Sequence, residues 1–155
     1  MYLKAPEGHP STHKQEDFFV RGQPIRVRFF VSNIGGTTAT ITDGGCWVYR
    51  NPPGGWLPAL PPYEGLSGQG IALGPLVHGD AKPVDVESNW KVGEPGEDPI
   101  EFVMGRAPLY VMGWFTFADE SGFSRTTAFC RIYQYPSGYF VPVENRDYEH
   151  ADAHE

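Results

Sequence analysis

The chain has 155 residues, which is enough for one domain with a hydrophobic core of its own. Its formal net charge of −7 argues against a nucleic-acid partner, because binding to phosphates requires clustered Lys and Arg. The 19 Gly, the 15 Pro and the aromatic fraction of 14% favour an all-β domain with many turns, since Pro inside a helix is costly.

Three regions are expected along the chain. Residues 1–16 are polar and predict a flexible N-terminal arm, residues 17–143 predict a β-sandwich domain, and residues 144–155 predict a disordered acidic tail. No stretch is long and apolar enough to span a bilayer, and the start contains no hydrophobic signal region. Two locations stay open: the periplasm or the cell envelope if an upstream anchor was removed, and the cytoplasm otherwise.

The first predicted strand runs from Ile25 to Asn33 and has the cleanest alternation in the chain. A period of two predicts one buried face, with Arg26, Arg28 and Ser32 on the other face and Phe30 as the exception. The residues expected on the buried face are Ile25, Val27, Phe29 and Val31.

Further strands are expected on both sides of a glycine pair. Residues 37–41 are rich in β-branched residues, and residues 46–50 predict another strand. Gly44 and Gly45 between them indicate a bulge or bend. Residues 82–90 predict a short polar strand at a sheet edge, and residues 139–143 predict the last short strand.

A β-hairpin is predicted for residues 109–133, and the rest of the fold is expected to be organised around it. Its first arm, 109–117, is apolar on both faces, which places it in the middle of a sheet or under a further layer. The turn 119–122 ends in Gly122, which can adopt a positive φ.

The segment 51–75 is unusually rich in Pro and Gly and carries several large apolar residues. Such a long loop in a compact domain indicates either a flap that covers an open end of the sandwich or a recognition surface. Trp90, near another loop, is a further candidate for ligand stacking. The residues expected to contact a partner or ligand are Trp56, Leu57, Leu60, Tyr63 and Trp90.

Cys46 and Cys130 are the two cysteines of the chain, and both fall in predicted strands beside an aromatic residue. In an exported sandwich they could form a disulfide across the core, and in the cytoplasm they would be small buried thiols. Both alternatives remain open at this point, since a disulfide requires Cα atoms within about 7 Å.

Two runs of residues are similar to motifs of known proteins. The run 31–39, VSNIGGTTA, resembles the V-x-N-x-G-x-T-x-A signature that joins the second and third strands of many bacterial immunoglobulin-like β-sandwich modules. In that signature the Asn and Gly make the turn, and the Ala begins the next buried strand.

A second pattern resembles Y-x-x-G-x-x-x-Y-x-D-x-x-G … T-x-F-C, which occurs in uncharacterised bacterial proteins behind an N-terminal membrane helix. Phe117 stands where that pattern has its second Tyr. The resemblance implies a membrane-anchored protein of the bacterial envelope, with this chain reaching the membrane only through an anchor that it lacks. The residues that carry it are Gly113, Asp119, Gly122, Thr127, Phe129 and Cys130.

The fold class expected from these features is an immunoglobulin-like antiparallel β-sandwich of seven to nine short strands with a long Pro/Gly-rich loop. His78 is the single His inside the predicted domain, in a turn beside Asp80, and no Ser lies in a Gly-x-Ser-x-Gly elbow. We therefore expect no catalytic residue, cofactor or metal.

The leading hypothesis is a non-catalytic interaction or structural module with a protein partner or self-association. The alternatives are a carbohydrate- or small-ligand-binding module and, last, a hydrolytic enzyme.

Overall fold

The computed structural model describes residues 3–4, 19–50, 57–58, 69–71, 73–93, 107–134, 139–148 and 150–154. Across these residues the chain is all-β, with ten strand elements in two antiparallel sheets and no helix. The all-β prediction is therefore confirmed. None of the described segments forms a helix of the length and hydrophobicity that crossing a bilayer requires.

The smaller sheet has three strands in the order β1-β2-β6, namely β1 (Leu3–Lys4), β2 (Pro24–Asn33) and β6 (Ala81–Lys91). The alternation predicted for β2 is confirmed, because every second residue from Ile25 is buried. Phe30 is the predicted exception and leaves 48% of its surface exposed on the outer face. The sheet therefore has one face in the core and one in solvent.

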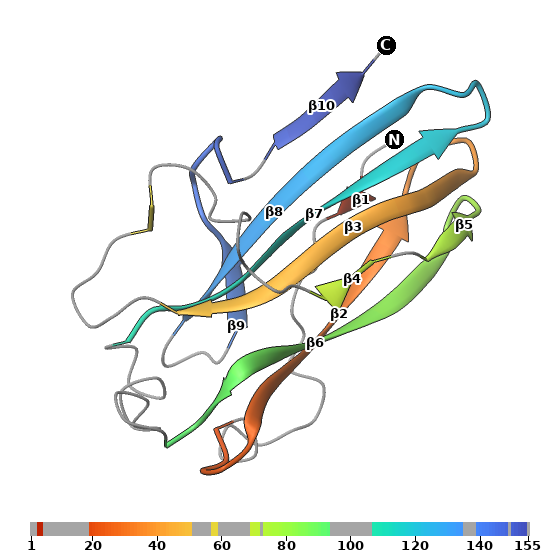
Figure 1. Ribbon diagram of the computed structural model, residues 1–155. Helices are drawn as coiled ribbons and strands as arrows, with labels where there is room; N and C mark the ends of the chain where they lie inside the picture. Colours follow the sequence, from red (N-terminus) through yellow and green to blue (C-terminus); the bar gives the residue numbers. More distant parts are fainter. Residues whose placement is uncertain are drawn as a thin grey trace.

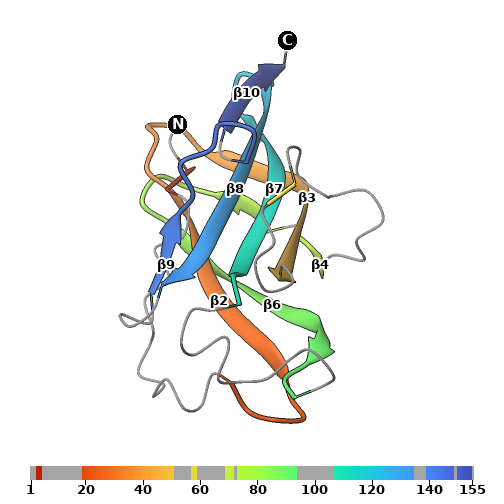
Figure 2. The same ribbon diagram turned by 90° about the vertical axis from the view of Figure 1, so that its left-hand side faces the viewer.

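The larger sheet has seven strands, with β7 (Leu109–Asp119) between β3 (Ala39–Arg50) and β8 (Ser124–Gln134). At its two edges, β10 (His150–His154) and β9 (Tyr139–Pro142) pair with β8, whereas β4 (Gln69–Gly70) and β5 (Gly74–Leu76) pair with β3. Figures 1 and 2 show β2 and β6 as one layer and β3, β7 and β8 as the other. The arrangement is that of a sandwich.

The main core fills the space between the two layers. Side chains from β2 and β6 meet side chains from β3, β7 and β8 in one cluster of buried residues. The rings of Phe29 and Phe129, one from each sheet, meet edge to face with their centroids 5.3 Å apart. Phe129 also lies against Phe115 of the neighbouring strand, at 6.1 Å.

The predicted hairpin of residues 109–133 is confirmed, because β7 and β8 pair from Tyr110↔Ile132 to Ala118↔Ser124. Residues 109–113 are buried at every position, as expected for a central strand that is covered on both faces. Gly122 adopts a φ of 85° at the turn, and Asp119 accepts hydrogen bonds from the backbone and hydroxyl of Ser121.

Asn33 organises the turn between β2 and β3. Its side-chain amide donates 2.8 Å hydrogen bonds to the carbonyls of Thr37 and Leu76, and its Oδ1 accepts one from the N–H of Gly35. Asn33 is fully buried, and so is Ala39, the first residue of β3. Asn33 therefore makes the turn and Ala39 begins the next buried strand, as expected for the Asn and the Ala of the VSNIGGTTA run.

Several expectations need correction. Five strands are 10–12 residues long rather than short, and the two strands expected at 37–41 and 46–50 are one continuous strand, β3. Its irregularity lies between Ile41 and Asp43, just before the glycine pair. The strand expected at 82–90 is confirmed as an edge of the smaller sheet.

The expected disordered tail at 144–155 differs from the structure. Residues 150–154 form β10 against β8, and Tyr148 is fully buried. The acidic composition of this segment predicted that it is solvated. In the structure its backbone pairs with the edge of β8, and its single aromatic side chain is buried on an apolar surface. In the predicted flexible arm, residues 3–4 pair with Asn33 and Ser32, and the rest of the arm lies outside the described residues.

Candidate functional site

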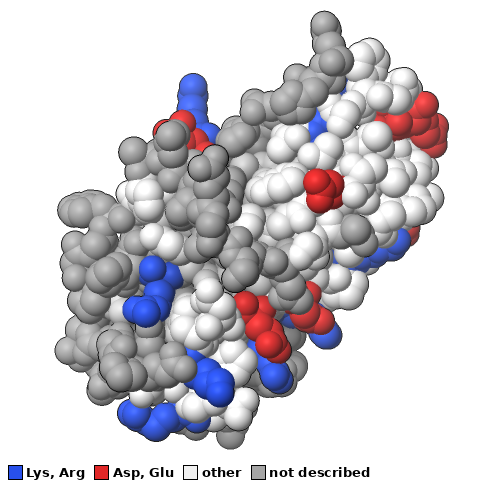
Figure 3. Space-filling view, in the orientation of Figure 1, with Lys and Arg blue, Asp and Glu red and all other residues white. Residues whose placement is uncertain are grey.

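A second hydrophobic cluster lies on the outer face of the larger sheet, outside the sandwich core. Figure 3 shows that the surface over β3, β7 and β8 carries few charged side chains. The outer face of an antiparallel sheet is usually polar, so an apolar outer face indicates that a further layer of the chain packs on it. Its buried members are Tyr110, Met112, Cys130 and Tyr148, and the half-buried residues packed against them are Trp47, Tyr49, Leu57, Ile132 and Val143.

The register of the three central strands builds this face. Trp47 of β3 pairs with Met112 of β7, which pairs with Cys130 of β8, and such direct partners share one face of the sheet. The next row outward along the strands is formed in the same way by Tyr49, Tyr110 and Ile132. Two adjacent rows of large side chains therefore form a continuous apolar platform.

Two segments from distant parts of the sequence cover the platform. Tyr148 is 0% exposed, and its hydroxyl donates a 2.6 Å hydrogen bond to the carbonyl of Pro58. Burial, followed by the proximity of Cys130, raises the pKa of Tyr148 to about 12, so the phenol is neutral and remains a donor at physiological pH. Tyr148 thereby holds residues 57–58 against the sheet.

An interruption of the sheet edge brings Tyr148 to this position. β9 and β10 pair with the same side of β8 and run in the same direction, as Figure 2 shows. Pro142 pairs with Arg131 of β8, and His150 pairs with Ala128. Seven residues lie between Pro142 and His150, whereas two residues lie between Arg131 and Ala128. The excess chain leaves the edge and carries Tyr148 over the outer face.

Of the five predicted contact residues, the structure describes Leu57 and Trp90, and Trp56, Leu60 and Tyr63 lie outside the described residues. Leu57 is half-buried and packs on the outer platform. Trp90 is half-buried too, but it packs on the main core at the end of β6. The structure therefore places these two predicted contacts on different surfaces.

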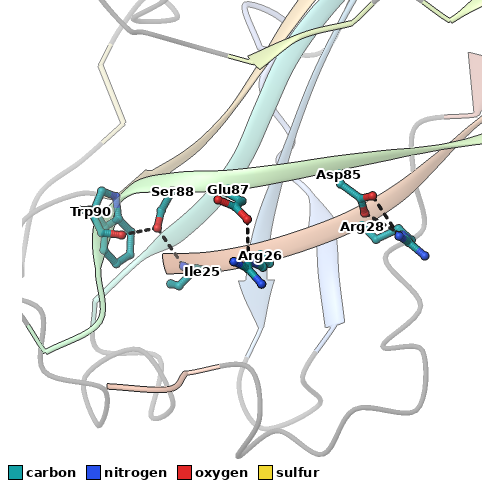
Figure 4. A network of polar contacts seen from close by, with 7 residues as sticks. All are labelled: Ile25, Arg26, Arg28, Asp85, Glu87, Ser88 and Trp90. Carbon is teal, nitrogen blue, oxygen red and sulfur yellow. Dashed lines mark hydrogen bonds and ion pairs between the residues drawn. The ribbon is translucent and has the colours of Figure 1, made fainter. Parts of the chain in front are cut away.

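Trp90 follows an irregular stretch of β6 (Figure 4). Pro24 pairs with Lys91 and Arg26 with Glu87, so the register shifts between these pairs. The hydroxyl of Ser88 bridges the two strands at this irregularity. It accepts a 2.9 Å hydrogen bond from the N–H of Ile25 and donates one of 2.5 Å to the carbonyl of Trp90.

The ring of Trp90 already has a partner on one face. The guanidinium carbon of Arg50 lies 5.3 Å from the ring centroid, which is a cation–π geometry. A sugar that stacks on Trp90 would have to displace either this cation or the core contact of the ring.

The outer face of the smaller sheet carries two exposed ion pairs. Arg26 reaches Glu87 at 2.6 Å and Arg28 reaches Asp85 at 2.6 Å, each across the β2–β6 ladder (Figure 4). The hydrogen bond and charge of Asp85 raise the pKa of Arg28, and the hydrogen bond from Arg28 lowers the pKa of Asp85. Exposed pairs of this kind contribute little to stability, and they give this face a polar, alternating charge pattern.

Neither cysteine forms a disulfide, and the two buried thiols lie on opposite faces of the larger sheet. Cys46 belongs to the core between the sheets and Cys130 to the outer platform. β7 lies between their strands, which separates the two backbones by about 10 Å, and the side chains lie on opposite faces of the sheet. The disulfide alternative does not fit this arrangement. Burial raises the pKa of each thiol to about 12.

His78 lies exposed in the turn before β6, where its Nδ1 forms a hydrogen bond with the carbonyl of Gly35. Asp80, next but one in sequence, accepts a 3.2 Å hydrogen bond from the N–H of Val77. The part of the chain that the structure describes contains no group of three His, Cys, Asp or Glu residues arranged to hold a metal ion.

The residues that sequence reasoning missed are Tyr148 and the outer-face aromatics of β3, Trp47 and Tyr49. The signal of Tyr148 in the sequence was a single Tyr within an otherwise polar C-terminal run, and an isolated aromatic residue of that kind gives no period to follow. Trp47 and Tyr49 alternate with core residues, so their burial depends on a covering layer that the strand pattern does not encode. Tyr110 lies on the second apolar face of residues 109–117, which was expected to be covered.

Comparisons with family models, with curated proteins and with solved structures found no match for this chain.

Proposed function

We propose that this chain is a non-catalytic interaction module of immunoglobulin-like type, the soluble part of a bacterial envelope protein, and that it binds a protein partner through residues 51–66. The observation that carries the proposal is the anchoring of residues 57–58 on the outer face. A recognition loop needs a fixed base, because every residue that is already held costs less entropy on binding.

The composition of the loop supports a protein partner. Trp56 directly precedes the anchored pair, and Leu60 and Tyr63 follow it within five residues of Pro58. Aromatic residues dominate the binding energy of protein interfaces, and Pro on both sides stiffens the backbone that presents them. The immunoglobulin-like part of the proposal is supported by Asn33 and Ala39, which have in this chain the roles that the V-x-N-x-G-x-T-x-A signature implies.

A photo-reactive amino acid at position 60 tests the proposal in cells of the source bacterium. We expect a defined crosslinked partner from position 60 and none from a matched probe at Asn89, which is exposed on the other sheet. The double variant Trp56→Ala/Tyr63→Ala should abolish the crosslink and leave the free energy of unfolding nearly unchanged. A large loss of stability would instead identify the loop as a structural flap and end the proposal.

Carbohydrate binding is the second candidate function, and the half-exposed ring of Trp90 is the feature that favours it. Its stacking with Arg50 counts against it, because one ring face is already taken. An oligosaccharide array separates the two functions: sugar binding that is lost on Trp90→Ala, with no effect of the Trp56→Ala/Tyr63→Ala pair, would favour the carbohydrate reading.

A further inference from the structure

β10 carries metal-binding residue types at alternate positions. Its sequence reads HADAH, and it lies along β8, as Figures 1 and 2 show, in unbroken register from His150↔Ala128 to His154↔Ser124. Successive residues of a strand lie on opposite faces of the sheet. His150, Asp152 and His154 therefore share one face, and the two alanines between them lie on the other face.

The register also identifies the face that these three residues share. Ala128 of β8 pairs with the first of them and is two residues from Cys130, so this face is the one that carries the outer platform. Thr126 pairs with the middle one, and its hydroxyl shares a 3.1 Å hydrogen bond with the hydroxyl of Thr116 on β7. Beyond the aromatic platform, the neighbours of β10 on β8 are thus short side chains, which do not crowd longer ligands on the adjacent strand.

The order His-Asp-His suits one metal ion above the middle of the strand. Residues two apart on a strand are separated by about 6.6 Å and residues four apart by about 13 Å. An imidazole reaches farther from its backbone than the carboxylate of Asp does. A metal ion above Asp152 is therefore within reach of an imidazole on each side and of the shorter ligand between them.

The donor set indicates which metal this is. Two imidazole nitrogens and one carboxylate oxygen are ligands that Zn²⁺ commonly takes, with water in the fourth position. Pairing with β8 fixes the backbone at all three positions before the metal arrives, so binding has less chain to order than in a flexible tail. Glu149 and Glu155, which flank the strand in the sequence, add negative charge that favours a cation.

We propose that His150, Asp152 and His154 bind one Zn²⁺ ion at the edge of the larger sheet. The expectation of no metal counted His78 as the single His of the domain, and β10 adds two more to it. For β10 the backbone is described, so the absence of a metal-binding group among the described side chains does not extend to this strand. The inference uses the edge of the larger sheet and stands apart from the loop surface proposed above.

Calorimetric titration of the full chain with zinc chloride tests the proposal. We expect one Zn²⁺ per chain. His150→Ala, Asp152→Ala and His154→Ala should each weaken binding by more than the about 10–100-fold that loss of a hydrogen-bond partner behind a metal ligand costs. Native affinity in any of these three variants, or no zinc binding by the native chain, would overturn the proposal.

The other histidines provide the controls. His78→Ala removes the exposed imidazole of the turn before β6, and the His9→Ala/His13→Ala chain removes the two near the start. Both should keep the native affinity for zinc. Loss of binding in either chain would place the metal elsewhere and overturn the assignment to β10.

The exchanged variant Ala153→His/His154→Ala tests the role of the strand itself. It keeps the composition and charge of the segment and moves one imidazole to the opposite face of the sheet. We expect it to bind zinc as weakly as His154→Ala. Affinity equal to that of the native chain would mean that the segment binds as a flexible tail, and would overturn the site.

Thermal denaturation gives a second measurement that does not depend on calorimetry. Zinc should raise the Tm of the native chain, because a ligand that binds the folded state stabilises it, and should leave the Tm of the exchanged variant unchanged. Denaturation without metal shows whether each variant still folds. An equal rise in both chains would contradict the proposal.

Discussion

Tyr148 and Pro58 lie 90 residues apart in sequence and are joined by a 2.6 Å hydrogen bond from the phenolic hydroxyl to the carbonyl oxygen. The contact links the C-terminal segment to the Pro/Gly-rich segment on the outer face of the larger sheet. It also gives the buried hydroxyl of Tyr148 a hydrogen-bond acceptor, which a phenol in an apolar cluster requires. The position of residues 57–58 on the sheet therefore depends on a residue that lies far away in the sequence.

Removing the hydroxyl with Tyr148→Phe should loosen residues 57–58 and leave the ring in place. We expect a loss of about 1 kcal/mol in the free energy of unfolding, the usual net contribution of one hydrogen bond, measured by urea denaturation. Tyr148→Ala, which also empties the buried ring site, should cost about 3–5 kcal/mol.

Amide hydrogen exchange locates the effect of the same change. The N–H of Leu57 should exchange faster in Tyr148→Phe, whereas the N–H of Val86, in the smaller sheet, should keep its wild-type rate. Equal acceleration at both sites would mean that the substitution weakens the whole domain and that the hydroxyl has no local role.

The sequence predicted best where burial follows a strict period. The alternation of β2 and the two buried faces of β7 are local patterns, so each could be read without knowledge of the partner strands. The turn at Gly122 was equally readable, because its chemistry is contained in four residues.

Apart from Tyr110 and Met112 of β7, the outer platform could not be read in this way. Its construction depends on which strands are neighbours and on a segment that returns across the sheet from the C-terminus. Tyr148 gives no period, and the acidic residues around it predicted solvation. A single side chain with a complementary apolar site outweighed the composition of the whole segment.

Asn33→Ala should be among the most destabilising single changes in the turn region. It would leave the carbonyls of Thr37 and Leu76 without the donor that they now share, of which the Leu76 contact is buried and the Thr37 contact is partly buried. Each buried group that loses its partner costs about 1–3 kcal/mol, so we expect a total of about 2–5 kcal/mol in chemical denaturation.

The neighbouring variant Ser32→Ala is the matched control for Asn33, since its side chain faces away from the core. It should change the free energy of unfolding by less than about 0.5 kcal/mol. Similar losses for both variants would show that the strand position, and not the amide of Asn33, is what matters.

Gly113→Ala tests the close approach of β3 and β7. A Cβ at this position would lie 2.3 Å from the carbonyl oxygen of Gly45 and 2.9 Å from the ring of Phe129, and neither the backbone nor the core ring can move away freely. Overpacking of this kind costs about 1–3 kcal/mol or more, which should appear as a lower denaturation midpoint.

Gly36→Ala controls for the intrinsic effect of replacing glycine. Its Cβ would have no heavy atom within 4 Å, and Gly36 is not among the glycines with a positive φ. We expect this variant to be neutral or slightly stabilised, because alanine restricts the unfolded chain. A Gly113→Ala variant as stable as Gly36→Ala would contradict the close packing of β3 on β7.

The thiols of Cys46 and Cys130 should make stability fall at alkaline pH. In the folded chain burial raises the pKa of each to about 12, from an ordinary value of 9.0. A raised folded pKa means that the contribution is complete below the unfolded pKa and is lost as the pH rises toward the folded one. Near pH 10.5 the unfolded chain has released protons that the folded chain keeps, which should cost about 2 kcal/mol for each thiol.

Urea denaturation from pH 8 to pH 11 measures this loss, and the Cys46→Ala/Cys130→Ala chain is the comparison. The double variant starts from a lower stability because two buried groups are truncated, but its decline with pH should be shallower, since Tyr148 and the other alkaline groups titrate in both chains. The native chain should also resist alkylation at pH 8, because the reactive thiolate is both rare and inaccessible. Parallel declines in the two chains, or fast alkylation of the native protein, would contradict the burial of the thiols on the two faces of the sheet.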